Sequence, residues 1–158
     1  MHKLPIIKQL EDELKEVERE LRLEIPKELR KAAAHGDLSE NAEYSAAKER
    51  QSFLQARFTH LHLRINTLAN LKLDSIPKDV VGFGSKVFLE DVNNGSSVVY
   101  ELVTPEEVDP KNGKISVGSL IGKALFGKME GDEVSINLPA GTKEYAVLKV
   151  LTIHEILG

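Results

Sequence analysis

The stretch His35-Gly36-Asp37-Leu38-Ser39-Glu40 decides the fold of the first half of the chain, because it separates two long runs with helical periodicity. Apolar side chains recur every three or four residues in both runs, which is typical of helices that bury a narrow seam against each other. The first run places them at Leu10, Leu14, Val17, Leu21 and Ile25. The second places them at Ala47, Leu54, Phe58, Leu61, Ile65 and Leu68, with the polar Gln51 in the same stripe. The short connection predicts an antiparallel hairpin, with arms of roughly thirty residues that form a rod about 45 Å long.

Pro26 interrupts the first helical run. Its ring removes one amide donor and clashes with the preceding turn, so we expect a kink or a split there.

The pattern changes after Leu73-Asp74-Ser75-Ile76-Pro77-Lys78, where the helical repeat stops and a proline appears. Beyond it, alternating and β-branched segments predict strands and one short helix. The strands are expected at 86–89, 97–103, 114–117, 133–138 and 144–153, and the helix at 119–126. We therefore predict an α+β protein with two domains, a coiled-coil hairpin over 1–75 and a small, mostly antiparallel sheet domain over 79–158.

Composition excludes several classes of protein. The chain has 158 residues, 41% of them hydrophobic and 29% charged, which are values of a globular protein. It contains no Cys, so disulfides and thiolate metal sites are excluded. No segment is apolar enough for a membrane span or a signal-peptide core, so we expect a cytoplasmic protein without a membrane partner. The net charge of −4 argues against a protein that coats duplex nucleic acid.

Motifs of common enzymes are missing. The sequence has no P-loop, GxGxxG, GxSxG or HExxH pattern. The histidines are scattered, and His60 and His62 point to different sides of a helix, so they do not share a metal ion easily.

Charge is unevenly distributed along the hairpin. All the arginines lie in the first half of the chain. Acidic residues dominate from Glu11 to Glu20, whereas basic residues gather on both sides of the 35–40 stretch. Such runs are most often solvated helix faces, but this segregation also fits a basic surface behind an acidic tip.

Asp37 and Glu40 are the residues with the clearest chemical content. Asp37-Leu38-Ser39-Glu40 fits a capping box at the start of the second helix, and Gly36 fits the left-handed end of the first. The alternative is functional: two exposed carboxylates on a rigid rod could complete the coordination of Mg²⁺ whose other ligands belong to a different protein, since two carboxylates alone hold that ion weakly. Spacing alone favours capping and leaves the functional alternative open.

Two segments resemble a known family. They are His35-Gly36-Asp37-Leu38-Ser39-Glu40-Asn41-Ala42-Glu43-Tyr44 and Ile115-Ser116-Val117-Gly118-Ser119-Leu120-Ile121-Gly122-Lys123-Ala124-Leu125-Phe126-Gly127-Lys128. With the order of hairpin then sheet, nearly the whole chain resembles the bacterial GreA/GreB transcript cleavage factors. The moderate basic patch is more similar to GreA than to GreB.

The resemblance implies a transcription elongation factor whose hairpin enters the secondary channel of backtracked bacterial RNA polymerase. Asp37 and Glu40 would help hold a second Mg²⁺ there and orient water, and the polymerase itself would cut the 3′ segment of the nascent RNA. The protein would then be no enzyme, would have no cofactor of its own and would act as a monomer. Lys48, Arg50 and Arg57 would face the RNA.

The same resemblance implies that residues 79–158 form an FKBP-like domain that docks on the polymerase through Ser119, Ile121 and Gly122. Leu120 stands where the family usually has Pro, and the N-terminus is shorter than usual. Three alternatives are open. The first is a channel-binding homologue that inhibits the polymerase, although such proteins tend to alter the tip acids. The second is a prolyl isomerase, which needs an aromatic-lined pocket. The third is a plain coiled-coil scaffold, which leaves the charge pattern unexplained.

Overall fold

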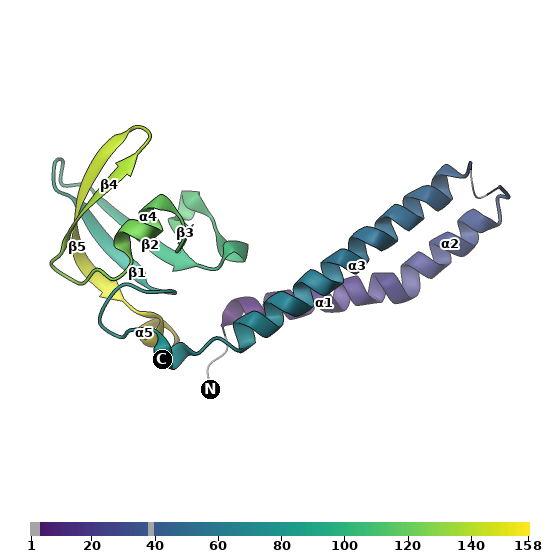
Figure 1. The fold of residues 1–158 in the computed structure, drawn as a ribbon, viewed down its shortest axis with the longest axis horizontal. Coiled ribbons are helices and arrows are strands. Elements are labelled where there is room, and N and C mark those ends of the chain that lie inside the picture. The colour runs from purple at the N-terminus through teal and green to yellow at the C-terminus, as the bar shows by residue number, and fades with distance from the viewer. Residues whose placement is uncertain (1–3, 38–39) are drawn as a thin grey trace. The chain divides into compact units, whose positions relative to one another are not determined.

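The computed structural model describes residues 4–37 and 40–158, and its contacts divide the chain into two compact units, Met1–Leu71 and Lys72–Gly158. The first unit is a helical hairpin, and the second is a curled five-stranded sheet with short helices (Figure 1). The predicted fold class is confirmed. No helix in the described part of the chain has the length and apolar character needed to cross a membrane.

The hairpin consists of an interrupted first arm and one continuous second helix. The first arm comprises α1 (Pro5–Arg19), a π-helical segment (Glu20–Glu24, below called the π turn) and α2 (Ile25–Ala33). The second arm is α3 (Ala42–Ala69), which packs against both α1 and α2. The apolar stripes face each other, as the sequence predicts. The buried members are Leu10, Val17, Ile25, Ala32, Ala47, Leu54, Leu61 and Leu68.

The π turn explains how the first arm accommodates Pro26. The amide of Ile25 donates to the carbonyl of Glu20, five residues back, where an α-helix uses four. Pro26 then lies in the first turn of α2, where its missing amide hydrogen costs least. The predicted interruption of the arm is therefore confirmed, and its form is a π turn.

The π turn also absorbs one extra residue in the heptad repeat. Leu10, Val17, Ile25 and Ala32 would be seven residues apart throughout if one residue were removed between Val17 and Ile25. Because the wider turn takes up that residue, Ile25 and Ala32 remain 1% and 2% exposed in the seam. The π turn thus keeps α2 correctly rotated against α3 on the way to the tip.

The second unit contains a sheet of order β3-β2-β1-β5-β4. Its strands are β1 (Lys86–Asp91), β2 (Ser97–Val103), β3 (Lys114–Ser116), β4 (Glu133–Leu138) and β5 (Gly141–Leu151). Neighbouring strands are antiparallel except β2 and β3, which are parallel, so the sheet is mixed. The helices are α4 (Leu120–Leu125), α5 (Ile153–Leu157) and one-turn 3₁₀ segments at Leu73–Ser75, Pro105–Glu107 and Pro110–Asn112.

One element differs from the sequence prediction. The last strand was expected to continue to Ile153, but β5 ends at Leu151 and α5 begins at Ile153. The cause is a capping box, in which the Thr152 amide and hydroxyl both donate to the Glu155 carboxylate.

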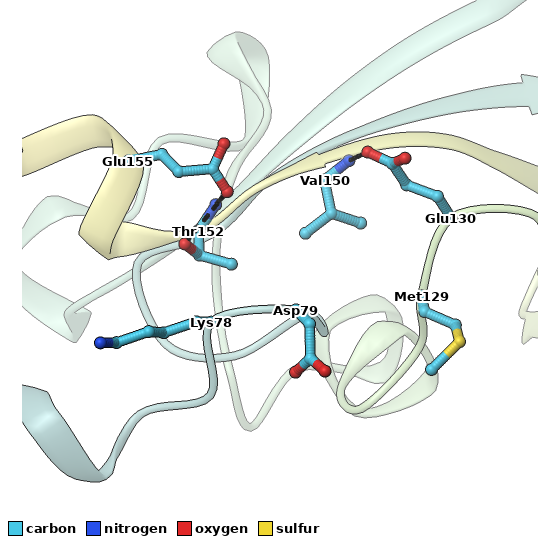
Figure 2. A pocket seen from close by; sticks show the side chains of 7 residues that line it. All are labelled: Lys78, Asp79, Met129, Glu130, Val150, Thr152 and Glu155. Carbon is cyan, nitrogen blue, oxygen red and sulfur yellow. Dashed lines mark hydrogen bonds between the residues drawn. The ribbon is translucent and has the colours of Figure 1, made fainter.

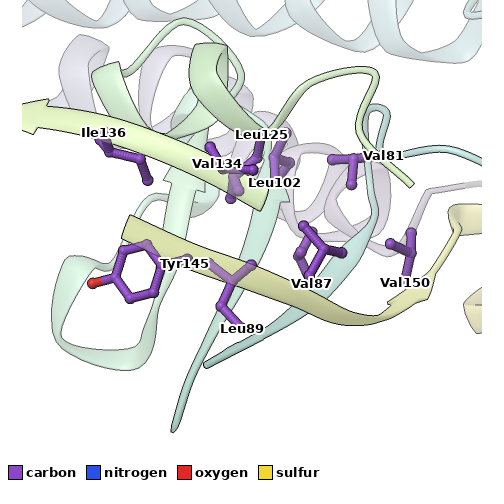
Figure 3. Close-up of a cluster of buried hydrophobic side chains, with 10 residues drawn as sticks. Val81, Val87, Leu89, Leu102, Leu125, Val134, Ile136, Tyr145 and Val150 are labelled. Carbon is purple, nitrogen blue, oxygen red and sulfur yellow. The ribbon is translucent and has the colours of Figure 1, made fainter. Parts of the chain in front are cut away.

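The core of the second unit lies where β1, β2, β4 and β5 meet α4 (Figure 3). The cluster consists of buried aliphatic side chains, most of them from these elements, together with the ring of Tyr145. Burial raises the pKa of the neighbouring Tyr100. The core of this unit is therefore mainly apolar packing.

Candidate functional site

The tip of the hairpin displays the two predicted acids. Helix α2 ends at Ala33, and backbone bonds from His35 to Ala32 and from Gly36 to Ala33 close its last turn. Gly36 then takes a φ of 106°, the positive region that a side chain disfavours. Asp37 and Glu40 are both exposed. Leu38 and Ser39 of the predicted tip lie outside the described residues.

The second helix does not begin at the predicted capping box. Helix α3 begins at Ala42, and its N-cap is Asn41, whose side-chain oxygen accepts from the Tyr44 amide at 3.0 Å. Asp37 and Glu40 precede the cap, so their carboxylates are not the groups that start the helix. The correction matters because the acids can be changed without removing the cap.

Asn41 also joins the two arms. Its side-chain Nδ2 donates to the carbonyl oxygen of Ala32, near the end of α2, at 2.7 Å. On the same end of the hairpin, His35 Nε2 lies 3.6 Å from the carboxylate of Glu43 in the first turn of α3. That contact becomes an ion pair when the imidazole is protonated. Glu43 also suits its position, since the start of a helix favours negative charge.

Two ion pairs connect the arms below the tip. Arg57 donates through Nε and Nη2 to the Glu13 carboxylate, both at 2.8 Å. Arg50 donates in the same forked manner to Glu20, at 2.7 and 3.2 Å. The acids are one heptad apart, and so are the arginines. The pairs therefore occupy equivalent flanking positions of an antiparallel coiled coil.

The predicted RNA-facing residues thus have different surroundings. Arg50 and Arg57 engage acids on the opposite arm, and the hydrogen bond from Arg50 lowers the pKa of Glu20. Lys48 is exposed, donates to Gln51 of its own helix at 3.4 Å and approaches the ring of Tyr44. None of these contacts tests the contact with RNA, which stays a prediction.

The tip has donors of the right chemistry for a hard cation, but they are few. Within residues 4–37 and 40–158, no group of three or more His, Asp or Glu side chains is placed to hold a metal ion. Carboxylate oxygens are the ligands that Mg²⁺ prefers, and the ion keeps water in its remaining positions. Asp37 and Glu40 are donors of a suitable type for Mg²⁺ but too few to hold it alone, and a site shared with another molecule stays a prediction.

In the second unit, the predicted docking residues build the start of α4. The Ser119 hydroxyl caps the helix by accepting from the Gly122 amide at 3.0 Å and donates to the Ser116 carbonyl at 2.7 Å. A Cβ on Gly122 would lie 2.2 Å from that carbonyl oxygen, so only glycine fits. Ile121 packs against the core. The exposed apolar side chains here are Leu120 and Phe126, at 60% and 51%. The docking role stays a prediction.

A hollow of about 440 Å³ lies between the segment at Lys78 and the end of β5 (Figure 2). It is lined by Lys78, Asp79, Met129, Glu130, Val150, Thr152 and Glu155. Two of its carboxylates serve the backbone, since Glu130 accepts from the Val150 amide at 3.0 Å and Glu155 belongs to the cap of α5. The lining has no aromatic side chain, so it does not support a prolyl isomerase site.

Family models match both units. The model described as "Transcription elongation factor, N-terminal" matches residues 6–69, and "Transcription elongation factor, GreA/GreB, C-term" matches residues 76–152. The chain belongs to the GreA/GreB family of transcription elongation factors. The predicted family is therefore confirmed, and with it a role in transcription elongation and its regulation.

Individual relatives of this GreA/GreB family member agree. Transcription elongation factor GreA of Anaeromyxobacter sp. strain K is 42% identical over an alignment of 161 positions, which covers 99% of this chain and 97% of that protein. The GreA of Helicobacter hepaticus is 47% identical over 137 residues, covering 87% and 82%. Among solved structures, GreA factor homolog 1 of Thermus thermophilus is 29% identical, with 91% and 93% covered and a TM-score of 0.42.

The residues that sequence reasoning missed in this GreA/GreB family member are those that hold the tip in place. Asn41 could have been found, because Asn is a strong N-cap residue and it directly precedes a run of good helix formers. The pairing of Glu13 and Glu20 with the arginines needed the axial register of the arms. The sequence shows the acidic and basic runs, but only the structure shows that Glu13 and Glu20 face Arg57 and Arg50.

Proposed function

We propose that this protein is a GreA-like factor that binds bacterial RNA polymerase and stimulates its intrinsic cleavage of nascent RNA in backtracked complexes. In this proposal the hairpin enters the secondary channel, and the sheet domain docks at the rim. The protein acts as a monomer in the cytoplasm and is not itself the catalyst. Membership of the GreA/GreB family supports the partner and the process.

The proposal rests on one observation at the tip: the residue that caps α3 is not one of the two acids. Asn41 is the N-cap of α3, and Asp37 and Glu40 both precede it in the chain. Both acids are exposed at the end of a rod whose arms are held together by an apolar seam and forked ion pairs. A rod of this kind can present carboxylates inside a narrow opening without a change of its own shape.

Asp37 and Glu40 would hold Mg²⁺ jointly with ligands of the polymerase. When bound, a second Mg²⁺ supplies charge stabilisation for hydrolysis of a phosphodiester bond. The residues of this chain supply negative charge, hydrogen-bond acceptors for water and a fixed position. Lys48 is an exposed cation near the tip whose side-chain hydrogen bond is a long one within its own helix, so it suits a contact with an RNA phosphate.

The test uses the variant Asp37→Asn with Glu40→Gln, which neutralises the tip and leaves the Asn41 cap in place. Stalled elongation complexes with labelled RNA are incubated with Mg²⁺ and each protein, and cleavage is followed with time. Wild type should accelerate cleavage, and the neutral variant should lose about a hundredfold of that acceleration, which corresponds to about 2.7 kcal/mol of transition-state stabilisation.

The matched control is Glu18→Gln with Glu49→Gln, which removes the same charge from exposed positions on the two arms. It should stimulate as wild type does. Binding to the polymerase, measured by fluorescence anisotropy, should be equal for all three proteins. A neutral tip that stimulates fully would refute the role of the two acids. Wild type that binds and slows RNA synthesis without cleavage would instead identify the inhibitory homologue.

A further inference from the structure

Asn41 has two different partners, and they belong to different arms. One side of its amide, Oδ1, accepts from the Tyr44 amide in the first turn of α3 at 3.0 Å. The other side, Nδ2, donates to the Ala32 carbonyl of α2 at 2.7 Å. A residue that served only as a helix cap would need the first bond alone.

The seam buries little apolar surface near the tip, so the hydrogen bond from Asn41 to the Ala32 carbonyl is more important there. Ala32 and Ala47 are the buried apolar side chains at this end of the described seam, and the next position, Gln51, is polar. Small side chains bury little apolar area, so packing restrains the last turns less than it restrains the rest of the rod. A hydrogen bond between the arms replaces part of that restraint.

The bond is placed where it affects the acids directly. Glu40 is covalently attached to Asn41, and Asp37 lies in the same connection between the arms. Tying Asn41 to both helices fixes the end of that connection in position relative to both arms. Misplacing a reacting or coordinating group by about 1 Å can cost a hundredfold in rate.

Loss of the bond between the arms need not unfold the helix end. The Ala32 carbonyl also accepts from the His35 amide at 3.1 Å, so it keeps a hydrogen-bond partner without Asn41. The cap of α3 and the link between the arms are therefore separable by substitution.

We propose that Asn41 is a positioning residue, whose link to the Ala32 carbonyl holds Asp37 and Glu40 in the geometry required to assist RNA cleavage. This inference rests on the proposed function for its activity readout. Its physical content, the restraint of the tip, can be measured without the polymerase.

The experiment compares Asn41→Ser with Asn41→Ala. Serine is a good N-cap, so it keeps the bond to the Tyr44 amide, but it is too short to reach Ala32 and carries no amide donor. Alanine loses both bonds. Alanine should lower the melting temperature of the hairpin, followed by circular dichroism, more than serine does, because it loses the cap as well as the link between the arms.

Both variants should lower the maximal rate of stimulated cleavage by about ten- to a hundredfold. The concentration of factor that gives half-maximal stimulation should stay unchanged, because the binding surface is intact. The concentration of Mg²⁺ required should rise. If serine matches wild type in cleavage, Asn41 acts only as a cap and the proposal is wrong. A fall in polymerase binding that accounts for the whole effect would also refute it.

A second readout separates this proposal from the proposed function. ¹⁵N relaxation of the free protein should show lower order parameters for the Asp37 and Glu40 amides in Asn41→Ser than in wild type. Unchanged order parameters would refute the positioning role even if wild type stimulates cleavage. Lower order parameters with no stimulation by wild type would refute the proposed function and leave the restraint of the tip established.

Discussion

Exchanging the charges of Glu20 and Arg50 tests whether the basic side chains of α3 act within the hairpin or on a partner. Arg50 is 49% exposed and Glu20 25%, and the guanidinium donates to both carboxylate oxygens. Exposed ion pairs contribute about 0.2–1 kcal/mol, and forked geometry places this pair toward the upper end. The single substitution Arg50→Glu removes the pair and sets two carboxylates against each other.

We expect Arg50→Glu to destabilise the hairpin by about 1 kcal/mol, which lowers the melting temperature by about 4–8 °C for a unit of this size. Adding Glu20→Arg should recover most of the loss, because the pair re-forms with its charges exchanged. Recovery should be incomplete, since Arg50 also lies 5.3 Å from the ring centroid of Phe53, a contact worth about 0.5 kcal/mol. Circular dichroism follows the hairpin, which holds most of the helix in the molecule.

The cleavage assay decides the role of Arg50. If it acts by keeping the arms in register, the exchanged pair should restore stimulation together with stability. Recovery of stability without recovery of cleavage would refute this reasoning and favour a direct contact with RNA. Lys48→Glu is the comparison, because it makes the same charge change on α3 at a side chain bonded within its own helix.

Three further predictions concern the hairpin. Ile25→Ala truncates a side chain that is 1% exposed and should lower the free energy of unfolding, measured with urea, by about 2–5 kcal/mol. A loss below about 1 kcal/mol would show that the seam is loosely packed at this position. Deleting Leu23 should place Pro26 inside a regular α-helix and lower the free energy of unfolding by about 3 kcal/mol. Combining the deletion with Pro26→Ala should recover stability, because the first arm then has a regular heptad repeat. Equal melting temperatures for the two variants would refute the account of the π turn. Because Arg50 lowers the pKa of Glu20, the pair stabilises the fold at pH values above the ordinary glutamate pKa, and this contribution is lost as the pH falls through the lowered pKa. The difference in melting temperature between wild type and Glu20→Gln should therefore shrink below about pH 4. It should not shrink near pH 7.

Local patterns were sufficient for most of the fold. The three- and four-residue spacing from Leu10 to Ile25 and from Ala47 to Leu68 predicted the hairpin, because the side that a helical residue faces depends on its position alone. The helix over 119–126 and the five strands were also predicted close to their observed bounds. The parallel pairing of β2 with β3 was not predicted, since it depends on how segments distant in the sequence meet.

The connection at residues 35–40 shows the limit of prediction from local patterns. The sequence by itself determined an acidic connection between two helical arms, a helix interruption at Pro26 and, by resemblance, the family. Only the tertiary structure decided that the side chain of Asn41, the local cap of α3, also reaches Ala32 on the other arm. It also decided that Arg50 and Arg57 pair with acids of the first arm. The physical reason is that these contacts depend on the axial register of the arms and on the residue absorbed by the π turn, and both arise only when the seam closes.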